Sequence, residues 1–248
     1  MKLRTALLTD SSAYLRVSIA IVIALAVIAM AVWLPNPFVE TQASAPPQDT
    51  AQGVSQAQGA RYVEIAPNAY VFTEPYPVAS FRLLTQDDRP FDNSALKGKW
   101  SLLFFGYTHC PDVCPTTLAV FDQIQRALGE TGARDVQFVF VTVDPARDTP
   151  QHLKKYVASF NPELLGVTGD SAEIARLSQS MGVMYEKVAG GSDQDYFMNH
   201  STAVQVTDPA GRLHGIFGGP HVAQNIVRAF QQMRHAGEAA QLGHQSAR

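Results

Sequence analysis

The 248-residue sequence contains only two cysteines, Cys110 and Cys114, and both lie in one short stretch. Two thiols cannot form the framework of several disulfides that holds many small secreted proteins together. They also supply only half of the four ligands that a structural zinc ion requires. The sequence equally lacks a strong charge of either sign, because its net charge is −3. We therefore expect no nucleic-acid-binding surface and one small site at the cysteines.

Charged residues are absent from residues 17–34, which are almost wholly apolar. A helix of this length spans roughly 27 Å, close to the hydrocarbon core of a bilayer. Lys2, Arg4 and Arg16 precede the run, and no Lys or Arg follows it until Arg61. The positive-inside rule then places residues 1–16 in the cytoplasm and the main domain on the outer, periplasmic or equivalent, face of the cell inner membrane. A cleaved signal peptide is the alternative, but its apolar core is usually shorter.

The sequence beyond this predicted single-pass anchor divides by composition into three parts. Residues 35–59 are rich in Ala, Gln, Pro and Ser, and we expect a flexible linker over residues 35–78. Residues 79–236 are expected to form the folded domain. The polar residues 237–248 are expected to be a frayed tail.

Strand-like and helical patterns alternate within residues 79–236. The apolar run at 136–143 is typical of a central strand that is covered on both faces. Further strands are predicted at 101–107, 164–168, 183–188, 202–207 and 212–217, and helices at 115–128, 149–160, 172–181 and 223–234. This alternation predicts an α/β sheet.

The cysteine stretch lies on a turn between a predicted buried strand and a predicted helix. Pro115 suits the first helical position and disfavours the α conformation at Cys114, so we expect Cys114 at the N-cap. The helix dipole lowers the pKa of a thiol placed there and favours the thiolate. A structural disulfide, half of a zinc site and a pair of inert buried thiols remain alternative interpretations.

The spacing of the two thiols is Cys-x-x-x-Cys, one residue wider than the redox motif Cys-x-x-Cys. Gly106 to Leu118, which reads GYTHCPDVCPTTL, resembles the signature of the Sco (SenC/PrrC) family. Val143 to Pro150 resembles the Asp-Pro-x-Arg-Asp-Thr-Pro block of that family, and Asn199 to Ser201 resembles its Asp-His-Ser block. The three blocks occur in the family's order, and the resemblance covers about residues 79–233.

Sco proteins are membrane-anchored, thioredoxin-like copper proteins linked to cytochrome c oxidase assembly. The resemblance implies a thioredoxin-like α/β domain with a family insertion, preceded by one transmembrane helix. It implies copper, as Cu(I) or Cu(II), as the bound metal, with Cys110, Cys114 and His200 as ligands. Without the resemblance, His200 would be interpreted as a surface or core histidine. Asn199 stands where the family usually has aspartate, which puts copper affinity or partner choice in doubt.

Four further residues are candidates for contacts around the metal or with a partner. Asp144, Arg147 and Asp148 follow a strand, at the edge where α/β folds usually bind ligands. They are interpreted either as a docking surface or as local caps and an ion pair. Tyr107 is interpreted as a residue that supports the ligands or as a packing residue, and Asn199 as a residue that supports the ligands or contacts a partner. His109 is expected to point away from the cysteines.

Two functions are consistent with these residues. The first is a metallochaperone that delivers copper to a cytochrome oxidase subunit or to another copper chaperone, after a thiol reductant has reduced Cys110 and Cys114. The second is a thiol–disulfide oxidoreductase that reduces the cysteines of the oxidase copper site or of another exported partner. His200 would be dispensable for the second function. A copper or redox sensor has little support, because residues 1–16 offer only a short cytoplasmic segment.

Overall fold

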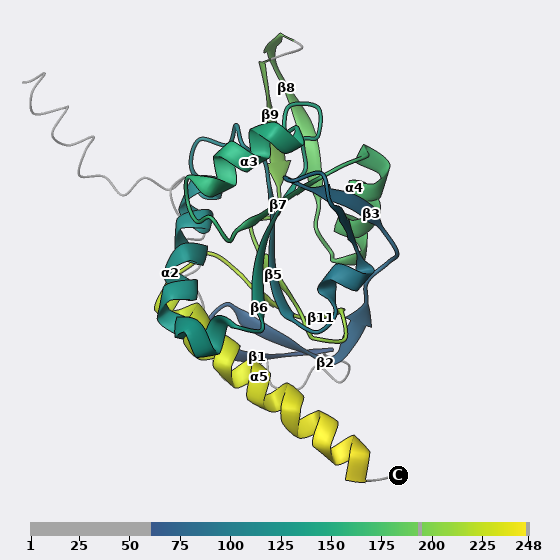
Figure 1. Ribbon diagram of the computed structural model, residues 1–248, viewed down its shortest axis with the longest axis vertical. Coiled ribbons are helices and arrows are strands. Elements are labelled where there is room, and N and C mark those ends of the chain that lie inside the picture. Colours follow the sequence, from purple (N-terminus) through teal and green to yellow (C-terminus); the bar gives the residue numbers. More distant parts are fainter. Residues whose placement is uncertain (1–60, 193–194, 247–248) are drawn as a thin grey trace, which may run out of the picture. The chain divides into compact units, whose positions relative to one another are not determined.

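The computed structural model describes residues 61–192 and 195–246 (Figure 1). The predicted anchor at 17–34, the segment before it and most of the predicted linker lie outside these residues. Among the described residues, no helix combines the length and the apolar character needed to cross a membrane.

Nine strands form one mixed sheet in the order β1-β2-β11-β10-β5-β6-β7-β3-β4. The strands are β1 (Tyr62–Ala66), β2 (Ala69–Pro77), β3 (Arg82–Thr85), β4 (Pro90–Asp92), β5 (Trp100–Gly106), β6 (Val136–Thr142), β7 (Leu165–Thr168), β10 (Val204–Thr207) and β11 (Arg212–Phe217). Strands β5, β6 and β7 are parallel, and the other neighbours pair antiparallel. The predicted α/β sheet is thus present, with a parallel centre and antiparallel flanks.

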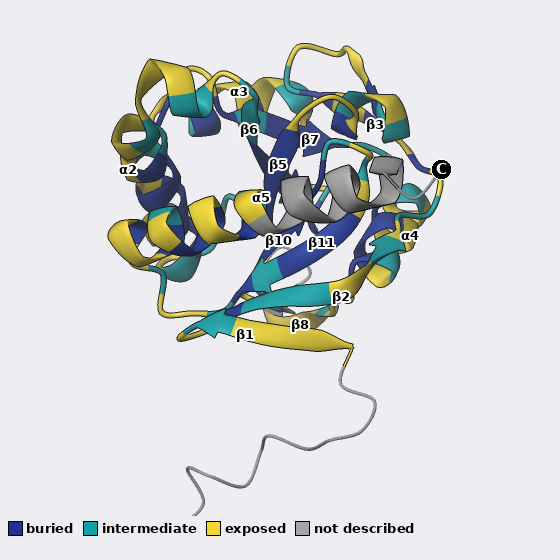
Figure 2. Ribbon diagram, turned by 90° about the horizontal axis from the view of Figure 1, so that it is seen from below, coloured by how far each residue is buried: buried dark blue, intermediate teal, exposed yellow. Residues whose placement is uncertain are grey.

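The core lies around β5, whose seven residues are all buried (Figure 2). The four residues of β10 and the last five of β6 are buried as well. Most of these buried residues are apolar, because helices cover the sheet on both sides; the buried polar ones are Ser101, Thr142, Gln205 and Thr207. The end of β5, where the cysteine stretch begins, is therefore anchored in the buried centre of the domain.

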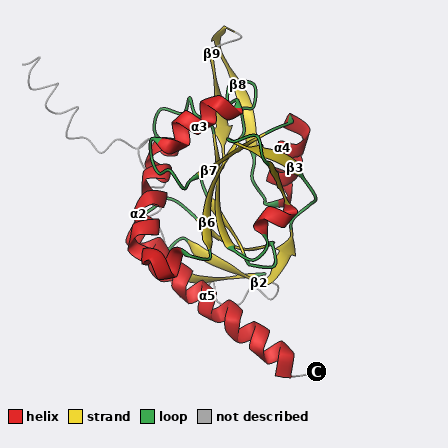
Figure 3. Ribbon diagram, viewed as in Figure 1, coloured by secondary structure: helices red, strands yellow, loops and turns green. Residues whose placement is uncertain are grey.

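The helices are η1 (Asn93–Leu96), α2 (Val113–Ala133), α3 (Pro150–Ala158), α4 (Ser171–Ser180) and α5 (Ala223–Ser246). Helices α2 and α4 lie on opposite sides of the parallel strands (Figure 3). Thr149 and Asp170 cap α3 and α4 by accepting hydrogen bonds from backbone N–H groups. Gly129 has a positive φ of 67° and interrupts the helical backbone of α2, at the residue predicted to end that helix.

Two predicted boundaries are wrong. Residues 62–77 belong to strands β1 and β2, so the linker does not extend to residue 78. These residues are rich in aromatic and β-branched side chains, which favour strands, and β2 pairs with β11. At the other end, α5 continues to Ser246, beyond the predicted start of the tail. The segment is polar on the whole, but the Ala, Glu, Gln and Leu residues between 238 and 245 are good helix formers.

A two-stranded hairpin stands outside the main sheet. It consists of β8 (Tyr185–Ser192) and β9 (Asp195–His200), which pair antiparallel with Tyr185 opposite His200. Figure 1 shows the hairpin extending past α3 at the top of the view. The predicted strands at 183–188 and 202–207 leave His200 on a loop between them, whereas it is the last residue of β9. The hairpin therefore positions the candidate histidine ligand.

Candidate metal centre

The two cysteines flank the start of α2. This helix begins at Val113 with Asp112 at the N-cap, so Cys114 lies in its first turn and not at the N-cap as predicted. Pro115 is accommodated as the third helical residue, because the first backbone N–H groups of a helix have no partner within it. Both thiols are free; Cys114 is buried and Cys110 is half-buried. The loop thus presents one accessible and one protected sulfur.

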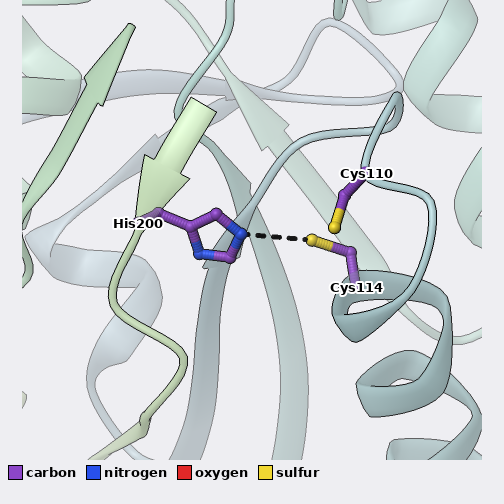
Figure 4. Close-up of side chains that lie close together, drawn as sticks. All are labelled: Cys110, Cys114 and His200. Carbon is purple, nitrogen blue, oxygen red and sulfur yellow. Dashed lines mark hydrogen bonds between the residues drawn. The ribbon is translucent and has the colours of Figure 1, made fainter. Parts of the chain in front are cut away.

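His200 approaches these sulfurs from β9. Its Nε2 lies 3.5 Å from Cys114 Sγ (Figure 4). The three potential ligand atoms, two sulfurs and this nitrogen, all lie within 4.8 Å of one another. The structure therefore brings together the three residues that the sequence singled out, from segments 86 residues apart.

A hydrogen bond to the backbone fixes the protonation of the imidazole. His200 Nδ1 lies 2.9 Å from the backbone oxygen of Ser201. A carbonyl oxygen can only accept, so Nδ1 carries the proton and donates it to Ser201. Nε2 is then left with a lone pair directed at the cysteines. This is the tautomer that a metal-ligating histidine requires.

Aromatic side chains hold the imidazole in place. The rings of Phe104 and Tyr107 pack edge-to-face on His200, with centroids 6.0 and 5.9 Å away. Tyr107 is only 3% exposed, and its hydroxyl hydrogen-bonds to the backbone of Met198 in β9. Tyr107 thus packs on the His200 ring and also ties β9 to the end of β5.

The two thiols share one negative charge. The pKa of Cys110 is lowered to about 5, chiefly because the Cys114 thiol donates a hydrogen bond to it, helped by the backbone N–H groups of Asp112 and Cys114. The pKa of Cys114 is raised, because it donates that hydrogen bond and is buried. The thiolate therefore lies on the more accessible Cys110. Two sulfurs and an imidazole nitrogen form a donor set that suits copper in either oxidation state.

Comparison with known proteins identifies the family. A family model described as SCO1/SenC matches residues 73–235, most of the folded part. The chain belongs to the SCO1/SenC family. It is 40% identical over 147 residues to the human mitochondrial SCO2 homolog, a match that covers 59% of this chain and 55% of that protein. The chain thus spans little more than half of the length of this relative.

Solved structures of Sco proteins agree with the fold. The structure of Bradyrhizobium japonicum ScoI with copper bound has 39% sequence identity and a TM-score of 0.57, and covers 64% of this chain and 98% of that one. Yeast Sco1 with copper bound has 29% identity and a TM-score of 0.59, and covers 64% and 88% respectively. The domain therefore has the thioredoxin-like α/β fold of the Sco family.

Asp148 of this Sco-family chain is fully buried beneath the cysteine loop. Its Oδ2 accepts hydrogen bonds from the backbone N–H of Thr108 (3.0 Å) and the hydroxyl of Thr142 (2.6 Å). Its Oδ1 accepts from the hydroxyl of Thr108 (2.6 Å). The carboxylate ties the loop to the end of β6, and it lies too deep to be part of the docking surface considered from the sequence.

Asp144 and Arg147 connect the same region to the hairpin. Asp144 is also buried, and it accepts hydrogen bonds from Arg147 Nε and from the Tyr196 hydroxyl (2.7 Å). The Arg147 guanidinium lies 3.6 Å from the centroid of the Tyr196 ring and donates to the Tyr196 backbone oxygen. The local ion pair considered from the sequence is thus present. Sequence reasoning missed Tyr196. The available signal was the pair of adjacent aromatic residues, Tyr196 and Phe197, shortly before His200.

Asn199 lies on the face of β9 opposite to His200, because neighbouring residues of a strand alternate. Its Nδ2 donates to Glu186 Oε1 across the hairpin, at 3.3 Å. The aspartate that is usual in Sco proteins would place a second carboxylate against Glu186 here. Asparagine replaces that repulsion with a hydrogen bond. The departure from the family pattern is therefore explained within this chain's own hairpin.

Proposed function

We propose that this Sco-family chain is a copper metallochaperone that holds one copper ion through Cys110, Cys114 and His200. The observation that carries the proposal is the convergence of two sulfurs and an unprotonated imidazole nitrogen within 4.8 Å. The copper-bound structures of related Sco proteins support the choice of metal. In line with the family resemblance, the proposed recipient is the copper centre of a cytochrome oxidase subunit, reached directly or through another chaperone.

The difference in exposure between the two thiols suggests an order of transfer. A thiolate from the recipient reaches copper on the side of Cys110, the accessible ligand, and replaces it first. Cys114 and His200 hold the ion until further ligands exchange. A pocket of about 560 Å³ adjoins His200 and is lined by Met184, Tyr185, Glu186, Asn199 and Ser201 as well. This pocket provides room for a recipient's side chains on the histidine side.

Loading requires both thiols in the reduced state. Oxidation of Cys110 and Cys114 to a disulfide releases two protons and two electrons to an oxidant, and it removes both sulfur ligands. A thiol reductant must reverse that step before copper binds.

The uncharged run at 17–34 supports a membrane anchor, with the domain on the outer face of the inner membrane and residues 35–60 as its tether.

Copper stoichiometry and absorption spectra of the reduced chain test this proposal. We expect one copper per chain and thiolate-to-Cu(II) absorption bands. His200→Ala should abolish those bands and weaken Cu(II) binding by about tenfold or more, because a ligand is lost. His235→Ala is the matched control, since this histidine lies on α5 and belongs to neither group of potential ligands in the described residues. Copper binding that is indifferent to His200 would overturn the three-ligand site.

A specific feature also favours thiol–disulfide exchange as a second candidate function. The accessible Cys110 holds the thiolate, and the buried Cys114 holds the proton. Cys110 would attack a partner disulfide, form a mixed disulfide and release one partner thiolate. Cys114, on losing its proton, would then attack Cys110, close the Cys110–Cys114 disulfide and release the second partner thiol.

A trapping experiment separates the two functions. With reduction of a disulfide peptide as the assay, Cys114→Ser should accumulate the mixed disulfide at Cys110, whereas His200→Ala should retain the rate. An inactive wild-type chain that still binds copper would leave only the chaperone function.

A further inference from the structure

A second group of potential metal ligands lies beside the cysteine loop. His109 follows β5, Asp148 follows β6, and His152 is in the first turn of α3. One ring nitrogen of each histidine and one carboxylate oxygen all lie within 4.8 Å of one another. His109 Nδ1 is 3.9 Å from Asp148 Oδ1, and the two imidazoles stack with their centroids 5.8 Å apart. This group shares no ligand residue with the centre formed by Cys110, Cys114 and His200.

The hydroxyl of Thr108 lies among the three ligand atoms. It is 2.6 Å from Asp148 Oδ1, 3.1 Å from His109 Nδ1 and 2.9 Å from His152 Nε2. A carboxylate only accepts, so the hydroxyl proton goes to Asp148, and both histidines donate to the Thr108 oxygen. Three polar side chains thus converge on one oxygen. A cation bound by the same three side chains could take the place of that oxygen. Both histidines are exposed, so each ring can turn its lone pair inward by moving its proton to the other nitrogen.

Charge and ligand type define what this group would bind. Asp148 is a buried carboxylate, and its negative charge favours a cation next to it. Imidazole and carboxylate ligands without sulfur suit borderline divalent ions, and Cu²⁺ binds such sites more tightly than Zn²⁺. We infer that His109, His152 and Asp148 form a second metal site, which takes a divalent ion of this class, with Cu²⁺ preferred. Thr108 rotates away or remains as a weak oxygen ligand when the ion binds.

This site goes beyond the proposed chaperone function and does not depend on it. Because it contains no sulfur, oxidation of Cys110 and Cys114 to a disulfide leaves its ligands intact. The chain would therefore hold a divalent ion next to the cysteine loop even when the cysteines cannot bind copper. His109 and Cys110 are consecutive in the sequence, so the two sites are neighbours in the same loop.

The test removes the first site and asks whether Cu²⁺ still binds. The full chain carrying Cys110→Ser, Cys114→Ser and His200→Ala is dialysed against Cu²⁺, and the bound ion is examined by electron paramagnetic resonance. We expect one bound Cu²⁺ with hyperfine coupling to two nitrogens. Adding His152→Ala should weaken binding about tenfold or more and leave a single coupled nitrogen. Adding His235→Ala should change neither quantity.

His152 is exposed, so its replacement should not impair folding. His109→Gln provides an independent second variant, with the same expected loss. Absence of tight Cu²⁺ binding in the triple variant would overturn the second site, and so would binding unaffected by both histidine replacements. Neither result would bear on the cysteine centre, because its three ligands are absent from every protein in this experiment.

Discussion

At the scale of single residues, Cys110 and Cys114 differ in reactivity although they belong to one loop. The pKa of Cys110 is about 5, against a usual value of 9.0, while Cys114 is buried and keeps its proton. We predict that iodoacetamide modifies Cys110 with a rate that is half-maximal near pH 5, and that Cys114 resists modification in the folded chain. Mass spectrometry of the metal-free, reduced protein across a pH series measures both rates.

The control for this prediction is Cys114→Ala, which removes the hydrogen bond that contributes most to the lowered pKa of Cys110. The midpoint of Cys110 modification should then move towards 9.0. An unchanged midpoint would show that the backbone N–H groups of the loop, and not Cys114, stabilise the thiolate.

The same pair makes stability depend on pH with a definite sign. Between about pH 5 and 9, the folded chain has released the Cys110 proton that the unfolded chain still binds. The contribution of Cys110 to the free energy of unfolding is therefore absent below pH 5 and grows as the pH rises to 9. Above pH 9 the trend reverses, because Cys114 keeps in the folded chain a proton that it loses on unfolding.

The residues of the site were predictable where they lie in short motifs. Cys110 and Cys114 occur in one block and His200 in another, both displayed directly by the sequence, and the structure brings their ligand atoms together. The contact between His200 Nδ1 and Ser201 was not predictable, because it depends on how β9 ends. The same holds for Tyr196, whose hydroxyl meets Asp144 from 52 residues away. Such pairings are set by the fold and leave little trace in local sequence.

At the scale of elements, the close approach of α2 to β5 depends on Gly106. A β-carbon at this residue would lie 2.6 Å from Cys114 Sγ and 2.9 Å from the Phe140 ring. We predict that Gly106→Ala displaces the Cys114 sulfur and destabilises the fold by about 1–3 kcal/mol, as overpacking of a rigid core does. Copper affinity should fall as well, because the sulfur moves away from His200. Thermal unfolding and copper titration measure the two effects.

Gly132→Ala in α2 is the matched control. Its β-carbon would meet nothing closer than 3.5 Å, so this change should stabilise the helix by about 0.5–1 kcal/mol and leave copper affinity unchanged. If Gly106→Ala behaved like Gly132→Ala, the space between β5 and α2 would not limit the position of Cys114.

The elements that the sequence predicted are those with a strong hydrophobic pattern. Strand β6 follows from its apolar run, and helix α3 lies within the predicted helical segment 149–160. Strand β9 was missed because its residues do not form a simple apolar run and pair only with β8. Strand β1 was missed for a related reason, since most of its residues are exposed at the edge of the sheet. Elements whose partners are distant or few carry the weakest local signal.

At the scale of the whole molecule, the first two strands decide where the folded domain begins. Strand β2 pairs with β11, and Ile65, Ala66 and Val71 pack against the core. We predict that a chain of residues 60–248 unfolds at the same temperature as the full-length protein and binds copper equally well. A chain of residues 79–248 should unfold about 10 °C lower or more, because it loses several backbone hydrogen bonds and the apolar contacts of both strands.

The shorter chain should also associate, since removal of β2 leaves β11 as an unpaired sheet edge. Size-exclusion chromatography and thermal unfolding of the two shortened chains, compared side by side, test this. Equal behaviour of both would mean that residues 62–77 belong functionally to the tether, as their place next to a Pro- and Gln-rich segment first suggested. A stable longer chain and an associating shorter one would instead fix the tether as ending near residue 60. In the proposed membrane-anchored chaperone, residues 35–60 alone would then set how far Cys110, Cys114 and His200 can reach from the membrane.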